Sequence, residues 1–354
     1  MYVIQPLGES RTTVAETMLT VTSVPEVAPA IYVNGTTYGL DAEVSIAGTL
    51  NRFDVYRSLQ APNAGHPPAS SPAWWRHLGT TYGTFVPGSY ALGAHVIDPV
   101  AHLEYESLVA ANTALLTDDT KWLELGPTNR WRALDLNSST GTTAPSPLSY
   151  TITPGRRIDA VGLASVMADS FTISMKQAGE EIWTHSESLS TRVVRSWRDW
   201  LTKGFTFRDA SMVLDLPLVS SAEVTITFFR AGGEVTVGAL FINRAVFIGD
   251  VEEQPSDGAD NYSRFGRNIE GSATSFIPGR VIPILSATCF AEAERVPEIR
   301  ALRTDTKATP AFWGGLRDAK NPYFSSLQRV GVWRRFELTP GHPDARIDLD
   351  VEEA

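Results

Sequence analysis

Three aromatic residues in the first hundred positions have the type and setting to stack on a ligand. Trp74 directly precedes a second tryptophan, and Tyr82 and Tyr90 lie in the following stretch TTYGTFVPGSY. An exposed aromatic ring offers a flat apolar face at low cost in side-chain entropy, which suits the C–H face of a sugar ring or a protein partner. We therefore predict that Trp74, Tyr82 and Tyr90 bind carbohydrate. The alternative for Trp74 is packing at the seam between two folding units.

A second cluster combines tryptophan with arginine in the stretch WTHSESLSTRVVRSWRDW, residues 183–200. Tryptophan and arginine are enriched among the residues that dominate binding energy at protein interfaces. We predict that this cluster forms a subunit contact rather than a ligand pocket. The alternative is an edge loop whose tryptophans fold back on their own domain while the arginines are solvated. The interface candidates are Trp183, Arg195, Trp197 and Trp200.

Catalytic motifs are missing from the sequence, which contains no GxSxG, HExxH, GxGxxG or Walker pattern. Acidic neighbours such as Asp118 and Asp119, or Glu180 and Glu181, are more often solvated charge than the opposed carboxylates of a glycosidase. The histidines are scattered without ligand-like spacing, and the single cysteine, Cys289, is predicted to be buried. We predict a protein that is not an enzyme and has no cofactor or metal.

Trp74, Tyr82 and Tyr90 lie within or beside a pattern of eight residues that occurs twice in the first third of the chain. The first five positions of the pattern are offset by 49 residues (105 − 56) and the last three by 47 (122 − 75), as expected for duplicated units with a small deletion in a loop. Units this small need dense aromatic packing in the absence of disulfides. We therefore predict that the repeated tyrosines and tryptophans superpose and are largely buried. The two copies are Tyr56, Ser58, Leu59, Ala61, Asn63, Trp75, Leu78, Gly79 and Tyr105, Ser107, Leu108, Ala110, Asn112, Trp122, Leu125, Gly126.

The repeats resemble a known family. TTYGLDAEV and VYRSL in the first copy, with YALGAHVIDPVAHLEYESLVAANT and DTKWLELGPTNRW in the second, are similar to small carbohydrate-binding modules of the chitin-binding type, families 5 and 12. In tailed-phage and prophage proteins such modules are followed by a β-sandwich and a tail-tip domain. The resemblance implies a baseplate or receptor-binding protein in the virion, with other tail proteins and a host-surface glycan as partners. The second copy carries Lys121 where the first has Trp74, so the module fold does not require Trp74.

The remainder of the chain alternates apolar and polar residues in short runs. Between Trp131 and Asp250, runs such as DSFTISMKQ and AEVTITFFR predict the antiparallel strands of a β-sandwich. RIDAVGLASVMADSFTISMK and TVGALFINRAVFIGD resemble a galactose-binding-like jelly roll. The stretch EEQPSDGADN then predicts a linker. Beyond it we expect further strands and one helix with Val296, Ile299 and Leu302 on one face.

The predicted fold class is mainly β and multidomain. It comprises an N-terminal segment (1–29), module 1 (30–83), module 2 (84–127), a jelly-roll β-sandwich (128–250) and a small α+β C-terminal domain (251–354). The net charge of −10 without a basic cluster argues against nucleic acid. The sequence shows neither a leader-like N-terminus nor a run of 18 apolar residues, so we expect no membrane insertion.

These features predict a structural component of a phage tail tip or baseplate. It would be made in the host cytoplasm, carried at the tail end of the virion as a homo-oligomer, and contribute to host-glycan binding. One alternative is a pure structural adaptor without glycan binding. A less favoured alternative is a glycan-degrading depolymerase.

Overall fold

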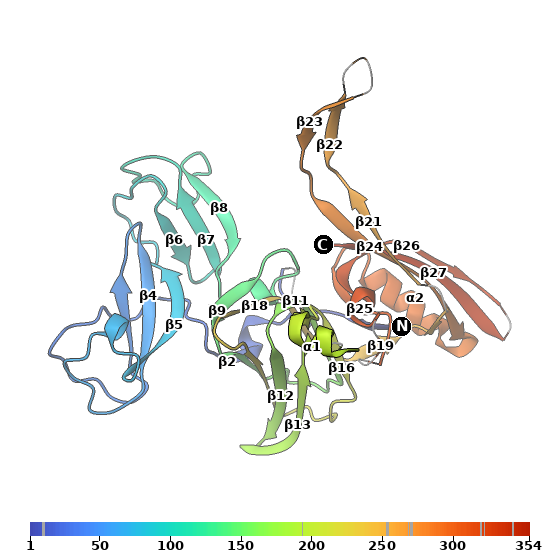
Figure 1. Ribbon diagram of the computed structural model, residues 1–354, viewed down its shortest axis with the longest axis horizontal. Coiled ribbons are helices and arrows are strands. Elements are labelled where there is room, and N and C mark those ends of the chain that lie inside the picture. Colours follow the sequence, from blue (N-terminus) through green and yellow to red (C-terminus); the bar gives the residue numbers. More distant parts are fainter. Residues whose placement is uncertain are drawn as a thin grey trace.

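The computed structural model describes residues 1–8, 11–192, 194–252, 255–267, 269, 272–318, 321, 323–341 and 343–354. The chain is mainly β and multidomain, as predicted. Figure 1 shows the paired modules, the β-sandwich and the C-terminal sheet following one another along the long axis of the molecule. None of the helices in these residues is long and apolar enough to cross a membrane.

The two modules are built alike, each from one three-stranded antiparallel sheet. The central strand shifts register at the same place in both copies, just before Tyr56 and just before Tyr105. Facing the shift are Gly79 (φ +126°) and Gly126 (φ +109°), in a backbone region that favours glycine. The strands are β3 (Glu43–Ala47), β4 (Arg52–Ser58) and β5 (Trp75–Tyr82) in module 1, and β6 (His95–Asp98), β7 (Leu103–Ser107) and β8 (Trp122–Pro127) in module 2.

Each module has a buried tryptophan at its centre. Trp75 and Trp122 are both 2% exposed, and each indole N–H donates to a backbone carbonyl, of His66 and Ala114 respectively. The repeated tyrosines Tyr56 and Tyr105 are less buried than the tryptophans, because both remain partly exposed. A three-stranded unit buries too little surface to enclose a second large ring.

The predicted jelly-roll β-sandwich consists of two antiparallel sheets, in the orders β13-β12-β17-β10-β2 and β16-β11-β18-β9. From β9 to β12, successive strands alternate between the two sheets, as in a jelly roll. The apolar sides of the strands, including Phe171, Ile173 and Phe228, are fully buried between the sheets, as predicted. The strands are β2 (Leu19–Thr22), β9 (Thr142–Pro145), β10 (Leu148–Ile152), β11 (Ala160–Met167), β12 (Ser170–Gln177), β13 (Glu180–Ser188), β16 (Ser211–Leu214), β17 (Glu223–Phe229) and β18 (Glu234–Asn243).

The C-terminal region forms a third large sheet, covered by helix α2 (Val296–Asp305). Ile299 and Leu302 of α2 are buried in its core, as the helical spacing predicts, and Cys289 is also buried there. The strands are β1 (Tyr2–Ile4), β19 (Ala245–Phe247), β20 (Asp250–Val251), β21 (Ser256–Asn261), β24 (Val281–Glu292), β25 (Ala311–Gly314), β26 (Gln328–Thr339) and β27 (Asp344–Glu353). Single 3-10 turns cover Glu16–Met18, Pro68–Ser70, Arg132–Leu134, Ala293–Arg295 and Ser325–Leu327.

Two of the predicted boundaries differ from the structure. Residues 1–29 are not a separate segment, because β1 pairs with β19 and β25 of the C-terminal sheet and β2 pairs with β10 of the sandwich. The predicted linker is also wrong, since β21 pairs with β24 along its whole length. All six residues of β21 are exposed, so the strand has no buried face and shows no alternation in the sequence.

The sandwich and the C-terminal sheet share one apolar cluster. It includes Ile4 of β1, Phe241 of β18 and Phe312 of β25. A Cβ on Gly162 of β11 would lie only 2.6 Å from Cγ of Phe312, so the two sheets approach closely because this residue has no side chain. We call these two units together the body and the paired modules the head.

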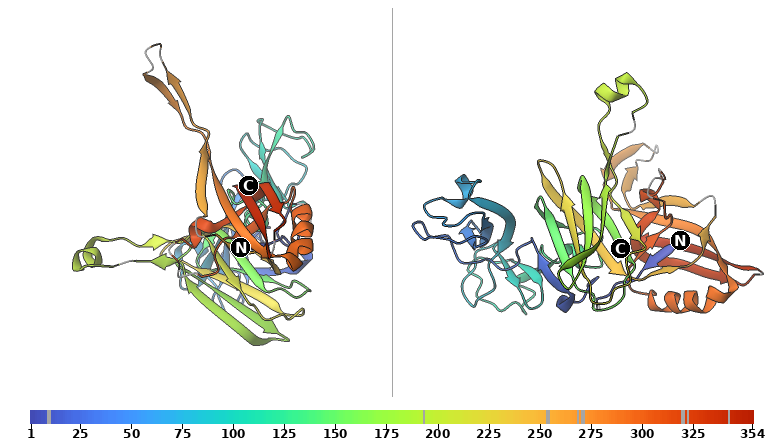
Figure 2. Two further views of the ribbon diagram at one scale, coloured as in Figure 1. Left: turned by 90° about the vertical axis from the view of Figure 1, so that its right-hand side faces the viewer. Right: turned by 90° about the horizontal axis from the view of Figure 1, so that it is seen from below.

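Two hairpins project from the body in different directions (Figures 1 and 2). The ribbon arm continues β21 and β24 into β22 (Arg264–Arg267) and β23 (Ala273–Ile277). The helical arm, residues 190–207, consists of β14 (Ser190–Thr191), α1 (Trp197–Thr202) and β15 (Thr206–Phe207).

Candidate functional site

The three predicted carbohydrate-binding residues are not brought together. Trp74 stacks on His66, with ring centroids 3.9 Å apart and planes at 13°, and is half-buried. His66 lies in the loop between Asn63 and Trp75, where its carbonyl accepts from the Trp75 indole as that of Ala114 accepts from Trp122 in module 2. The backbone carbonyl of Trp74 accepts a hydrogen bond from Leu59, a contact that Lys121 reproduces in module 2. The fold therefore uses the backbone of Trp74 but does not need its indole.

Tyr90 occupies a place that is repeated in both modules. Its ring packs edge-on against Trp122 at 5.3 Å and 72°, as Tyr38 packs against Trp75 at 5.4 Å and 71°. Its hydroxyl donates to the carbonyl of Val86 across 2.7 Å. Tyr90 thus belongs to the aromatic framework of module 2.

Tyr82, the last residue of β5, lies where the modules meet. Its ring stacks on His95 of module 2 with centroids 4.6 Å apart and planes at 19°. Burial raises the pKa of Tyr82, and the nearby Glu104 carboxylate adds to the rise, so the phenol stays protonated at neutral pH. Tyr82 borders a pocket of about 360 Å³ between the head and the sandwich, which we call the junction pocket. Its walls include Arg52, His77, Tyr82, Glu104, Asn129 and Thr143.

Glu104 forms a fixed part of the pocket wall. Its side chain is buried between His95 Nδ1 at 2.7 Å and Arg132 Nη2 at 2.9 Å. Because both carboxylate oxygens have partners, the charge is compensated and its position is defined. Within the described part of the chain, no group of three or more His, Cys, Asp or Glu side chains is arranged to hold a metal ion.

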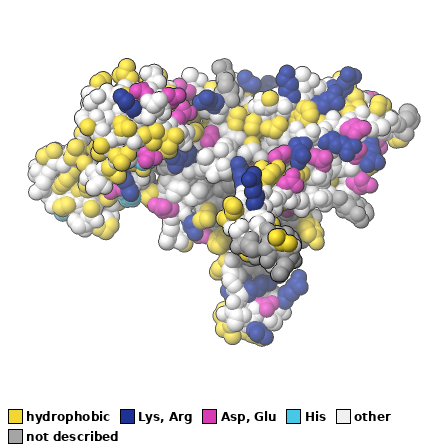
Figure 3. Space-filling view, turned by 90° about the horizontal axis from the view of Figure 1, so that it is seen from above, with side chains coloured by type: hydrophobic (Ala, Val, Ile, Leu, Met, Phe, Trp, Pro, Cys, Tyr) yellow, Lys and Arg dark blue, Asp and Glu magenta, His cyan; other side chains and the backbone are white. Residues whose placement is uncertain are grey.

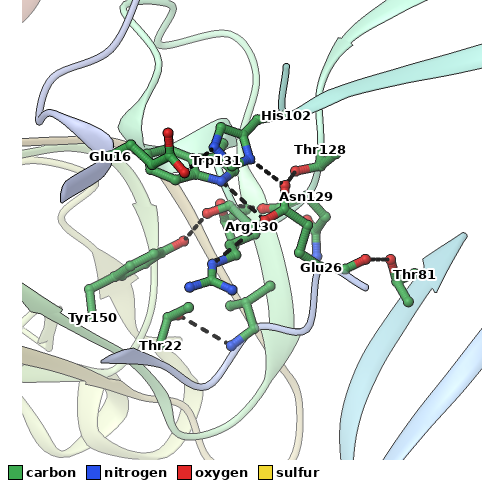
Figure 4. A network of polar contacts seen from close by, with 12 residues as sticks. Glu16, Thr22, Glu26, Thr81, His102, Thr128, Asn129, Arg130, Trp131 and Tyr150 are labelled. Carbon is green, nitrogen blue, oxygen red and sulfur yellow. Dashed lines mark hydrogen bonds and ion pairs between the residues drawn. The ribbon is translucent and has the colours of Figure 1, made fainter. Parts of the chain in front are cut away.

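A second buried carboxylate ties the head to the body (Figure 4). Glu26 is 7% exposed, and its carboxylate accepts from His102 Nδ1 and Thr128 Oγ1 at 2.8 Å and from Trp131 Nε1 at 3.4 Å. Its backbone carbonyl also accepts a hydrogen bond from the hydroxyl of Thr81 in module 1. This single residue therefore contacts both modules and the segment that leads into the sandwich. Sequence reasoning missed it because its partners lie 55 to 105 positions away.

The helical arm has a well-defined tip. Ser196 caps α1 by accepting a hydrogen bond from the backbone of Asp199 at 3.1 Å, and the Asp199 carboxylate accepts one from the backbone of Arg195 at 3.1 Å. At the other end of α1, Arg192 donates to the backbone carbonyls of Asp199 and Trp200. These contacts hold a helix of only two turns in place.

The tip carries apolar and basic side chains in water. Trp197 is 82% exposed and Trp200 is 55% exposed, and their rings meet edge-on at 6.1 Å. The helical arm, residues 190–207, holds four basic side chains and one acidic one, a net charge of +3 (4 − 1) on a chain of −10. Figure 3 shows hydrophobic and basic side chains together on the arm that projects from the lower edge of the view. The exposed apolar residues beside the tryptophans are Leu201, Phe205 and Phe207.

The four predicted interface residues are therefore divided. Arg195, Trp197 and Trp200 lie together at the tip and do not fold back on the sandwich. Trp183 instead lies on β13, where it packs against the sandwich core and runs parallel to the His185 ring at 5.9 Å. Comparison of the chain with protein-family models, with curated proteins and with solved structures gives no match.

Proposed function

We propose that this protein is a structural subunit of a phage or prophage tail tip or baseplate, not an enzyme, and that it contacts other subunits through the helical arm. The observation that carries the proposal is the exposed pair Trp197 and Trp200 on a basic, capped arm. Soluble monomers rarely expose contiguous aromatic area of this kind, and tryptophan and arginine dominate interface energetics. The resemblance of the modules to chitin-binding-type domains supports the tail setting.

The arm suits a protein partner better than a small ligand because it is convex and projects from the body. Capping by Ser196 and the contacts of Arg192 hold the tip in one conformation before binding. Such pre-organisation lowers the entropy that association must overcome. The positive tip favours a partner with an acidic surface, which other copies of this acidic chain also offer.

In the proposed tail tip, the head carries the modules toward a host-surface glycan. Weak sugar contacts then add up across the copies of an oligomer. A pure structural adaptor is the second candidate, favoured by the positions of Trp74 and Tyr90. One ring is stacked on His66 and the other packs on Trp122, so neither stands free as a platform.

The arm is tested by the double substitution Trp197→Ser and Trp200→Ser. Each tryptophan at an interface centre contributes about 2 kcal/mol or more, so each loss weakens association at least about thirtyfold. Val100→Ser is the matched control, because Val100 is an 87% exposed apolar residue in module 2. Sedimentation velocity measures self-association, and immunogold labelling of particles reports incorporation at the tail end. Unchanged association and incorporation of the double variant would contradict the proposal.

A further inference from the structure

We propose that the junction pocket binds one or two saccharide units of a glycan, and that this site exists only where both modules meet the sandwich. The inference deepens the glycan-binding part of the proposed function and rests on it. It places the sugar site in a pocket that both modules and the sandwich line together, instead of on the exposed face of one module.

The pocket wall comes from three units of the fold. Module 1 contributes Arg52, His77 and Tyr82, module 2 contributes Glu104, and Asn129 and Thr143 belong to the segment entering the sandwich and to its strand β9. A volume of about 360 Å³ lies within the range of small-ligand sites. Neither module alone therefore forms the pocket.

Direct contacts hold these three units together around the pocket. Arg76 Nη2 donates to the carbonyl of Pro147 at 2.8 Å, which joins module 1 to the sandwich. Asn51 Nδ2 donates to the carbonyl of His95 at 2.8 Å, which joins module 1 to module 2. Gly79 lies beside Pro145, where a Cβ would be 3.6 Å from the proline ring. The pocket is thus shaped before any ligand arrives.

The polar side chains of the pocket wall differ in whether they already have a hydrogen-bond partner within the protein. The side chain of Asn129 pairs with both backbone groups of Thr143, at 2.8 and 2.9 Å. By contrast, His77 Nε2 is buried without a hydrogen-bond partner, and its nearest carboxylate oxygen, on Asp54, is 3.9 Å away. Thr80 and Tyr82, which each carry a hydroxyl group, also line the pocket. A ligand with several hydroxyl groups can form hydrogen bonds with Thr80 and Tyr82.

Charge pairing in the wall favours a neutral ligand. Arg132 is bound to Glu104 at 2.9 Å, and Arg52 lies 3.6 Å from Asp54. The four charged side chains that line the pocket, Arg52, Arg132, Glu104 and Glu234, sum to no net charge, so the wall does not favour an anion. The Tyr82 ring, which is stacked on His95 on one side, lies beside polar side chains of the wall, and this combination matches a neutral sugar.

The test is saturation-transfer difference NMR on the full chain. The probes are glucose, galactose, N-acetylglucosamine, its β-1,4-linked disaccharide and, as an anionic comparison, galacturonate. The pocket variants are Tyr82→Phe, Thr80→Val and, from the sandwich side, Glu234→Ala. Tyr105→Phe is the matched control, because Tyr105 is a half-buried phenol of module 2 outside the pocket. Trp74→Ala tests the exposed-face alternative.

We expect a neutral sugar to bind and each pocket variant to weaken it about three- to tenfold, with Tyr105→Phe and Trp74→Ala unchanged. Absence of binding by every probe overturns the inference, as does loss of binding in Trp74→Ala with the pocket variants intact. Preferential binding of galacturonate overturns its neutral-ligand part. The arm variants leave the pocket intact, so failure here and failure of the assembly proposal are distinguishable.

Discussion

The side-chain amide of Asn63 donates a hydrogen bond to the hydroxyl of Ser58 across 2.9 Å inside module 1, and both residues are buried. The same bond joins Asn112 to Ser107 across 3.0 Å in module 2. Since this polar contact recurs with the edge-on aromatic packing and the strand shift, the two modules are one unit used twice. The aromatic repeat in the sequence reflects a repeated hydrogen-bond framework.

The first prediction concerns that framework. Asn112→Ala leaves the buried Ser107 hydroxyl without this donor and should destabilise module 2 by about 1 to 3 kcal/mol. Hydrogen exchange of residues 84–127 should accelerate while the body stays protected. Asn34→Ala, at an exposed asparagine, is the control and should change little. Unchanged exchange in Asn112→Ala would show that the bond is dispensable.

The second prediction concerns the contact between the sandwich and the C-terminal sheet. Gly162→Ala places a Cβ against the Phe312 ring and should destabilise the body by about 1 to 3 kcal/mol. Phe312→Leu in the same chain should recover part of the loss by making room. Gly39→Ala, where nothing lies within 4 Å of the added atom, serves as the control. Chemical denaturation would measure all of these, and additive losses in the double variant would argue against the contact.

The third prediction concerns pH. Burial raises the pKa of the Cys289 thiol from about 9 to about 11, so the unfolded chain ionises first as the pH rises. Between these values unfolding releases a proton that the folded state retains, and the free energy of unfolding should fall by about 2 to 3 kcal/mol. Below pH 9 the thiol is protonated in both the folded and the unfolded chain, so its contribution to the free energy of unfolding does not change with pH. Cys289→Ala should remove this part of the decline in denaturant titrations at stepped pH. An equal decline in the variant would assign it to other groups, such as Tyr150, whose pKa burial also raises.

The fourth prediction concerns the attachment of the head. Glu26→Ala leaves His102, Thr128 and Trp131 without their shared acceptor and should cost about 3 to 5 kcal/mol at the head–body junction. Small-angle scattering should show a broader distribution of shapes, and limited proteolysis should cut near residue 128. Glu43→Ala, at an exposed carboxylate of β3, is the comparison. A compact, protease-resistant Glu26→Ala protein would contradict the assigned role.

The fifth prediction is that the protein does not hydrolyse polysaccharide. The acidic neighbours Glu180 and Glu181 are exposed on β13, where water screens their charge. Incubation with host-envelope glycans should release no reducing ends above a heat-inactivated sample. Sustained release that disappears on replacing one acidic pair would overturn this prediction.

The sequence correctly predicts those strands that bury one side, because burial of one side requires apolar residues at alternate positions. Phe171 and Ile173 on β12 are such residues, and both are fully buried. It does not predict β21, whose residues are exposed on both sides. Nor does it place β1, since Val3 finds its partners some 240 to 310 positions away. The aromatic residues of the site were recognisable by type. The junction pocket was not, because Tyr82 and Asn129 meet only through the docking of the head.

The pairing of the first strands also determines the order in which the chain can mature on the ribosome. The modules can close once residue 127 has emerged, whereas β1 must wait for β25 near residue 314. Until then, the edge of β1 that pairs with β25 has no strand partner, and such edges invite aggregation. A prematurely terminated chain would therefore carry a finished head on an unfinished body. A chain truncated after residue 127 is therefore expected to contain folded modules without a folded body.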